Sequence, residues 1–149
     1  MNNNNANPDA LDEVLKKADD CYDKDDHPGA IESLEQALQM TDRHPVILRA
    51  LGTQLFLCGR HTWARTIFDE LTSQYPEEVD DHVHHAIANF HDGDPDSCAG
   101  ALQKALALDP HHKEALKLTA DLDAREGRYA EAMKKYELIA EKYGISVDS

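Results

Sequence analysis

The chain has 149 residues, 41% of them hydrophobic and 30% charged, a composition typical of one globular domain and not of a disordered chain. Its net charge of −14 repels phosphate backbones and anionic lipids, so we expect no nucleic-acid partner, and no apolar run is long enough for membrane insertion. The cysteines, three in number and without CxxC spacing, favour a reducing, cytoplasmic setting.

The first ten residues, MNNNNANPDA, lack the basic and apolar regions of a signal peptide, so we expect a disordered polar tail over residues 1–10. From residue 11 the chain realigns with itself at a shift of 34 residues, without a gap. The repeating blocks are 11–44, 45–78, 79–112 and 113–146, and a short tail follows over 147–149. We expect one domain over residues 11–146.

Each block has the pattern of a helical hairpin. Two places in the block carry small residues that let helices approach closely, namely Ala18, Gly52, Ala86 and Ala120 at the eighth place and Ala30, Ala64, Cys98 and Ala132 at the twentieth. The pattern predicts first helices over 12–24, 46–58, 80–92 and 114–126. It predicts second helices over 28–41, 62–75, 96–109 and 130–143.

Turn and cap residues punctuate these helices. Glycine recurs at the fifteenth place, where Asp25 stands in for it in the first block, and suits a tight turn between the two helices of a hairpin. Asp94 before Pro95 is typical of an N-cap followed by proline, and His27 before Pro28 is a weaker copy of the same signal.

The blocks together resemble the tetratricopeptide-repeat (TPR) family, most closely in KEALKLTADLDAREGRYAEAMKKYELIAEKYG and ALQKALALDPHHKE. The resemblance implies an all-α fold, a right-handed superhelical solenoid of four helical hairpins. It also implies a non-catalytic adaptor whose first helices line a concave groove for a protein or peptide. His82 and His85 depart from the family pattern, because large apolar residues normally pack at their positions.

Helical periodicity within this fold gives a candidate partner-binding surface. The groove floor would consist of apolar or small side chains on the inner face of the first helices: Thr53, Phe56, Leu57, Val83, Ile87 and Phe90. Its rim would be polar or aromatic: Asp19, Tyr22, Arg49, His84, His91, Asp121 and Arg125. The alternative is that Phe56 and Phe90 pack between adjacent first helices and contact no partner.

The charges indicate the chemistry of the partner. Chaperone-binding members of the family clamp a terminal carboxylate with lysine, asparagine and arginine, but the matching positions here hold Leu15, Asp19, Ala50, Asp80 and His84. The four blocks carry net charges of about −6, −1, −5 and 0. We therefore expect a partner of basic or apolar character, the alternative being that the acidic surface only keeps the chain dispersed.

The stretch DHVHHAIANFHDGDPDS, residues 81–97, is rich in metal-binding residue types. Two histidines three or four residues apart on a helix can hold zinc, but a zinc site needs a third or fourth ligand. The sequence offers only loop aspartates for that role, so we expect no metal and no cofactor. HExxH, GxSxG and glycine-rich phosphate loops are absent from the sequence, so we expect no enzyme. A histidine-based metal-binding protein is therefore the third hypothesis, after the two that follow from the resemblance and from the last helix.

The last helix carries more apolar residues than one neighbour can cover. Solenoids usually end in a polar capping helix, and none follows here. This indicates one of three alternatives: the chain is the front part of a longer protein, the partner docks at this end, or the end mediates self-association. In the last case we expect a homo-oligomer or a domain contact through Met133, Tyr136, Ile139 and Tyr143. The leading function is thus an adaptor or chaperone-like scaffold, and the second is the recruitment or oligomerisation arm of a larger multidomain enzyme or assembly.

Overall fold

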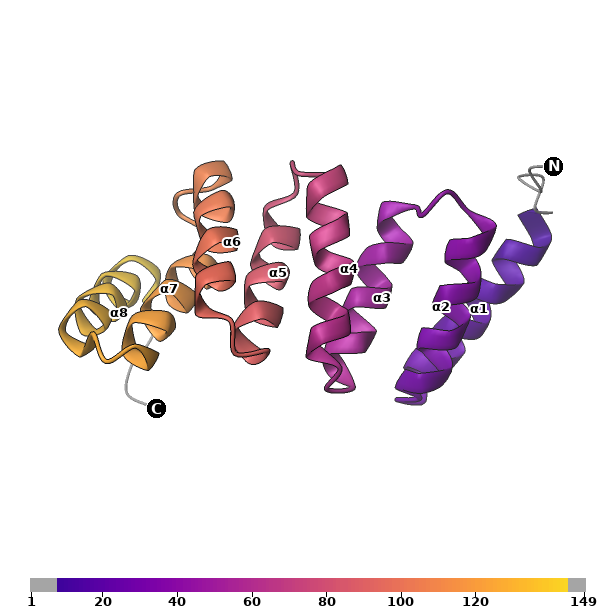
Figure 1. Ribbon diagram of the computed structural model, residues 1–149, viewed down its shortest axis with the longest axis horizontal. Coiled ribbons are helices and arrows are strands. Elements are labelled where there is room, and N and C mark those ends of the chain that lie inside the picture. The colour runs from indigo at the N-terminus through magenta and orange to yellow at the C-terminus, as the bar shows by residue number, and fades with distance from the viewer. Residues whose placement is uncertain (1–7, 145–149) are drawn as a thin grey trace. The chain divides into compact units, whose positions relative to one another are not determined.

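The computed structural model describes residues 8–144, all of whose regular structure is helical (Figure 1). The eight helices are α1 (Pro8–Asp23), α2 (His27–Met40), α3 (Pro45–Leu57), α4 (His61–Gln74), α5 (Val79–His91), α6 (Pro95–Leu108), α7 (Lys113–Arg125) and α8 (Tyr129–Tyr143). The predicted helices are confirmed within one residue, except that α1 begins four residues earlier than expected. Residues 8–10 of the predicted N-terminal tail are therefore helical. Residues 1–7 and 145–149 lie outside the described range, and they include the rest of that tail and all of the predicted tail over 147–149.

The chain divides into two compact units, each containing two hairpins. Unit 1 (Met1–Tyr75) contains α1 to α4, drawn in indigo to magenta in Figure 1, and unit 2 (Pro76–Ser149) contains α5 to α8. In unit 1, α2 of the first hairpin packs against α3 of the second. In unit 2, α7 packs against both helices of the preceding hairpin, α5 and α6. None of the described helices is long and apolar enough to cross a membrane.

The small residues of the repeat lie where the two helices of a hairpin meet. Those of the second helices, Ala30, Ala64, Cys98 and Ala132, are all at most 2% exposed. Gly52 of α3 shows why size matters there, because a Cβ added to it would lie 2.8 Å from the ring of Phe68 in α4. The repeat pattern is therefore a packing pattern, in which a small side chain on one helix leaves room for a large one on its partner.

The turns inside the hairpins use left-handed backbone. Gly59, Gly93 and Gly127 have φ angles of 82°, 79° and 82°, and Asp25 adopts the same region with φ of 55°. This conformation favours glycine, and aspartate is one of the few other residues that tolerate it. The prediction that Asp25 replaces the turn glycine in the first block is confirmed.

The second helices α2 and α6 begin at aspartate N-caps. Asp94 accepts a hydrogen bond from the Ser97 amide at 3.1 Å, which confirms the predicted cap. Asp26 does the same for the Gly29 amide at 3.1 Å, so the N-cap of α2 is Asp26 and not His27. His27 is the first residue of α2, and its Nδ1 lies 2.8 Å from Oε1 of Gln54 in α3.

Candidate functional site

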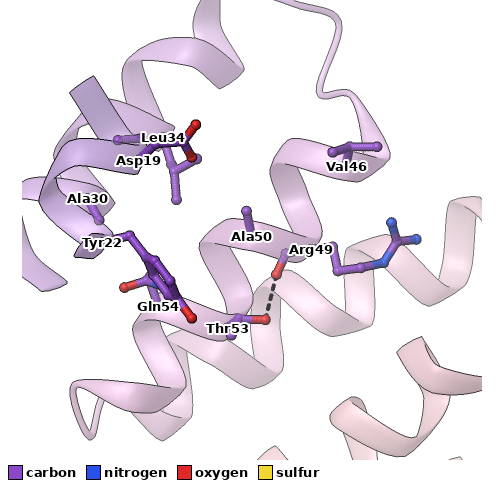
Figure 2. A pocket seen from close by; sticks show the side chains of 10 residues that line it. Asp19, Tyr22, Ala30, Leu34, Val46, Arg49, Ala50, Thr53 and Gln54 are labelled. Carbon is purple, nitrogen blue, oxygen red and sulfur yellow. Dashed lines mark hydrogen bonds between the residues drawn. The ribbon is translucent and has the colours of Figure 1, made fainter. Parts of the chain in front are cut away.

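An apolar cavity of about 360 Å³ lies in unit 1 on α1, α2 and α3 (Figure 2). Leu34 and Ala30 line it from α2, and Ala50 and Val46 line it from α3. Tyr22 of α1 projects into the same space and is 56% exposed, so its ring stands at the mouth of the cavity. The cavity can therefore receive an apolar side chain and present an aromatic face beside it.

The polar groups of this cavity come from α1 and α3. Asp19 and Arg49 both line it, and the Arg49 carbonyl accepts a hydrogen bond from the Thr53 hydroxyl at 2.9 Å. Figure 2 shows the guanidinium of Arg49 extending away from Tyr22. Asp19 is thus the one carboxylate of a mostly apolar lining.

Four of the residues predicted from the sequence meet at this cavity. Asp19 and Tyr22 come from the first block, and Arg49 and Thr53 come from the second. Val46 was not among the predicted site residues, yet it is 59% exposed at the edge of the cavity. The signal in the sequence was its spacing: Val46 lies in the first turn of α3, three residues before Arg49, which also lines the cavity.

The other predicted residues of unit 1 lie at the carboxyl end of α3. The ring of Phe56 packs against that of His61 in α4, with the ring centroids 4.9 Å apart. Leu57 is 51% exposed, and neither Phe56 nor Leu57 lines the cavity. They are therefore separate from the group that contains Tyr22.

In unit 2, the predicted floor residues belong largely to the core. Val83 is 1% exposed and packs in the core that α5, α6 and α7 share, which leaves no surface of its side chain for a partner. Ile87 and Phe90 are half-buried against the same core. Val83 was expected at an accessible groove floor, but it is buried in the core that α5 shares with α6 and α7.

Arg125 of α7 lies against the carboxyl end of α5. Its guanidinium carbon is 4.6 Å from the centre of the Phe90 ring, and Nη1 donates a hydrogen bond to the Phe90 carbonyl at 2.8 Å. The exposed ring of His91 meets that of Phe90 edge-on, with centroids 5.8 Å apart. Phe90 therefore packs toward the adjacent first helix, as the alternative interpretation proposed.

His84 lies in a polar depression of unit 2 at the start of α7, beside Asp80, His112 and Glu114. The Nδ1 of His112 accepts the Ala115 amide at 3.3 Å as the N-cap of α7, so Nε2 carries the proton and donates to Asp80 at 2.9 Å. His112 therefore caps the start of α7. Within residues 8–144, no three histidine, cysteine or acidic side chains are grouped to hold a metal ion.

The histidine-rich helix α5 packs despite its unusual composition. His82 is 2% exposed and its Nε2 lies 2.8 Å from the Pro76 carbonyl, while Asn89 donates to the His85 carbonyl at 2.9 Å. These bonds satisfy one polar atom of each side chain, whereas Nδ1 of His82 and Oδ1 of Asn89 are buried without a hydrogen-bond partner.

The four residues predicted for self-association differ in exposure. Met133 is 53% exposed, but Ile139 is 7% exposed and belongs to the packed side of α8. Tyr136 and Tyr143 are half-buried, and their hydroxyls donate to Asp121 and to the His111 carbonyl. Burial raises the pKa of Tyr136 to about 12, and the Asp121 carboxylate adds to this effect.

The sequence and the fold are both similar to known tetratricopeptide-repeat proteins. Residues 85–144 match the sequence model of the tetratricopeptide repeat. A tetratricopeptide repeat protein from Parabacteroides merdae ATCC 43184 superposes with a TM-score of 0.83 at 23% identity, over 93% of this chain and 56% of that one. The chain has the TPR fold. It spans little more than half of that relative's structure.

Two further TPR structures are similar. MamA (41-end) from Desulfovibrio magneticus RS-1 has a TM-score of 0.83 at 16% identity, over 93% of this chain and 78% of that one. The first TPR of Spaghetti (RPAP3), bound to the HSP90 peptide SRMEEVD, has a TM-score of 0.71 at 12% identity, over 78% of this chain and 93% of that one. No curated protein matches the sequence. These likenesses establish the TPR fold, and the family's sequence pattern lies in residues 85–144.

Proposed function

We propose that the chain is a non-catalytic scaffold, an adaptor or chaperone-like protein, which holds a segment of a partner protein in the unit 1 cavity. The observation that carries this proposal is the apolar cavity on α1, α2 and α3 with Tyr22 and Val46 exposed at its edge. Large side chains exposed beside an apolar hollow are the usual anchors of a protein interface. The TPR fold and the peptide bound to the RPAP3 neighbour support the same function.

The lining of the cavity supports binding over catalysis. It contains one carboxylate, Asp19, and neither histidine nor cysteine, so it offers no nucleophile with an adjacent base. The free cysteines elsewhere in the chain agree with a reducing, cytoplasmic setting.

The partner segment that fits this cavity has an apolar side chain next to a basic one. The apolar side chain fills the hollow, and the basic one meets Asp19 and the ring face of Tyr22. The RPAP3 neighbour binds an acidic peptide, but Asp19 and Ala50 stand at two of the positions where carboxylate-clamping relatives carry lysine, asparagine or arginine. The charge of this site therefore supports a different class of ligand.

A matched pair of exposed tyrosines tests the proposal. Tyr22 is 56% exposed and lines the cavity, whereas Tyr129 of α8 is 67% exposed and belongs to unit 2. A partner captured from lysate and then purified is titrated by calorimetry against wild type, Tyr22→Ala and Tyr129→Ala. We expect Tyr22→Ala to weaken binding about tenfold, as for an interface anchor, and Tyr129→Ala to leave it unchanged. Equal affinity of all three chains for the partner would count against the cavity as the binding site.

A second candidate function, self-association or recruitment to a larger assembly, is favoured by the surface of α8. Tyr129 and Met133 lie one turn apart and are 67% and 53% exposed. Two neighbouring large apolar side chains in water favour burial against another surface. Light scattering over a concentration series compares wild type with Met133→Glu: a dimer lost in the variant supports this candidate, and a monomeric wild type at high concentration rejects it.

A further inference from the structure

A second apolar cavity, of about 370 Å³, lies in unit 2 where α6, α7 and α8 meet. Leu106, Leu116 and Ile139 line it, and Leu138, which is 60% exposed, stands at its edge. Its charged lining consists of Lys135 and Lys142 with no carboxylate. This cavity is therefore apolar with a cationic edge, in a chain whose net charge is −14.

The two lysines of this cavity are in different electrostatic states. Lys135 forms an ion pair with Asp123, which also receives the guanidinium of Arg128 at 2.9 Å. Lys142 instead donates to Nδ1 of His111 at 2.5 Å and lies 5.7 Å from the centre of the Tyr143 ring. Neither group is a carboxylate, and within residues 8–144 no ion pair joins Lys142 to one. Among the described residues, Lys142 therefore has no carboxylate partner, and it lies beside an apolar hollow.

The equivalent positions in unit 1 can be compared with the surroundings of Lys142, because two repeats separate them. The residues 68 positions earlier in unit 1 are Arg43 for His111, Glu70 for Leu138 and Gln74 for Lys142. There the Arg43 guanidinium donates from Nε and Nη2 to both carboxylate oxygens of Glu70, at 2.5 and 2.6 Å.

Unit 1 therefore supplies its own carboxylate for the cation at this place. In unit 2 the carboxylate position carries the exposed Leu138 and the arginine position carries His111, while the cation is Lys142, one turn after Leu138 on α8. Among the described residues of unit 2, Lys142 therefore lies beside an apolar hollow and has no acidic side chain paired with it.

We propose that the α6–α7–α8 cavity binds a segment of a partner protein in which a bulky apolar side chain adjoins a glutamate or aspartate. The apolar side chain fills the hollow between Leu106, Leu116 and Ile139, and the carboxylate pairs with Lys142. This is the charge complement of the cavity and the opposite of the basic segment expected in unit 1. The site lies in another unit, so the proposal is independent of the proposed function.

The test uses a defined peptide and the full chain. The probe is a fluorescein-labelled octapeptide, blocked at its carboxyl end, in which two leucines flank two glutamates. Two control peptides replace the glutamates by lysine or the leucines by serine. Binding is measured by fluorescence anisotropy at low and at moderate salt, because screening weakens an exposed charge pair.

Matched protein variants locate the binding. Lys142→Glu reverses the charge at the cavity, and Lys134→Glu makes the same change at an exposed position of the same helix that does not line it. Leu138→Ser tests the apolar part at an exposed position, where folding does not depend on the side chain. Circular dichroism confirms that each variant keeps its helices.

We expect the acidic probe to bind wild type and both control peptides to bind at least about tenfold more weakly. We expect Lys142→Glu to weaken binding of the acidic probe by about tenfold or more, and Leu138→Ser to weaken it several-fold. Lys134→Glu should change the affinity by less than about twofold. The proposal is overturned if the acidic probe does not bind, if it binds no better than the lysine peptide, or if Lys134→Glu costs as much as Lys142→Glu.

Discussion

The guanidinium of Arg125 lies 4.6 Å from the centre of the Phe90 ring and donates to the carbonyl of the same residue. Two residues 35 positions apart thus form one contact between α5 and α7. Both were candidates for the partner surface, and both are engaged within unit 2. Their contact closes the carboxyl end of α5 against α7.

The ring face of Phe90 contributes to the stability of unit 2 through this contact. A double-mutant cycle of Arg125→Ala and Phe90→Leu separates the ring from the carbonyl hydrogen bond, since leucine keeps the carbonyl and most of the apolar contact. We expect a coupling of about 0.5–1 kcal/mol in urea unfolding, the range of an exposed cation–π pair. Additive effects of the two substitutions would show that the ring contributes nothing beyond its apolar area.

Replacement of glycine by alanine should have opposite effects on the free energy of unfolding at Gly52 and at Gly100. A Cβ on Gly52 would lie 2.8 Å from the buried ring of Phe68, whereas a Cβ on Gly100 of α6 meets nothing within 4 Å. Alanine favours a helix by about 1 kcal/mol over glycine, but overpacking a core costs about 1–3 kcal/mol. In denaturant unfolding we expect Gly52→Ala to destabilise by about 1 kcal/mol and Gly100→Ala to stabilise by about 0.5–1 kcal/mol.

The Gly52 result has its own control. Phe68→Leu in the background of Gly52→Ala removes the ring that the new methyl group meets, so the combined loss should be smaller than the sum of the single losses. If Gly52→Ala stabilises the chain as Gly100→Ala does, the close approach of α3 and α4 is contradicted.

Asp123 should make unfolding sensitive to acid. Its carboxylate is 5% exposed and accepts hydrogen bonds from Lys135 and Arg128, and these hold its pKa below the usual value in spite of burial. A depressed pKa stabilises the folded state above the unfolded pKa of about 4, and this contribution is lost as pH falls through the folded pKa.

Asp123→Asn measures that contribution. We expect a loss of about 1–2 kcal/mol in urea unfolding at pH 7, limited because Arg128 and Lys135 are partly exposed and can return to water. The difference from wild type should shrink below about pH 4. Glu137→Gln, at an exposed position of α8, serves as the control and should leave the unfolding profile unchanged. A constant difference between wild type and Asp123→Asn from pH 7 to pH 3 would exclude the ion pair as its cause.

Cys98 should be chemically inert in the folded chain. It is fully buried, and burial raises the pKa of its thiol to about 11. At pH 8 this leaves roughly one thiol in a thousand ionised, and the reagent must also reach it. We expect alkylation followed by peptide mass spectrometry to show the half-buried Cys58 labelled first and Cys98 labelled only with unfolding. Labelling of Cys98 as fast as Cys58 under native conditions would contradict its place between α5 and α6.

Much of the fold could be predicted from local features of the sequence. The spacing of small residues located each pair of helices, and Asp25 was recognised as a substitute for the turn glycine, since both depend on neighbours close in sequence. The cap of α2 was misplaced by one residue. Asp26 and His27 are adjacent, and only the bond from the Gly29 amide distinguishes them.

The candidate site was less accessible to this reasoning. Periodicity gave the face of α5 on which Val83 lies, but it did not show that α7 covers this face and leaves 1% of the side chain exposed. Val46 was not chosen as a site residue, although it is 59% exposed at the edge of the cavity.

The sequence by itself determined the helices, their turns and the small-to-large packing within each hairpin. These follow from backbone preferences and from spacing along one helix. The tertiary structure alone decided which apolar side chains stay exposed, where the two cavities lie, and that Lys142 meets the His111 ring while Arg43 meets the Glu70 carboxylate. Exposure and charge compensation depend on side chains that distant segments bring together, and helical spacing does not specify those distances.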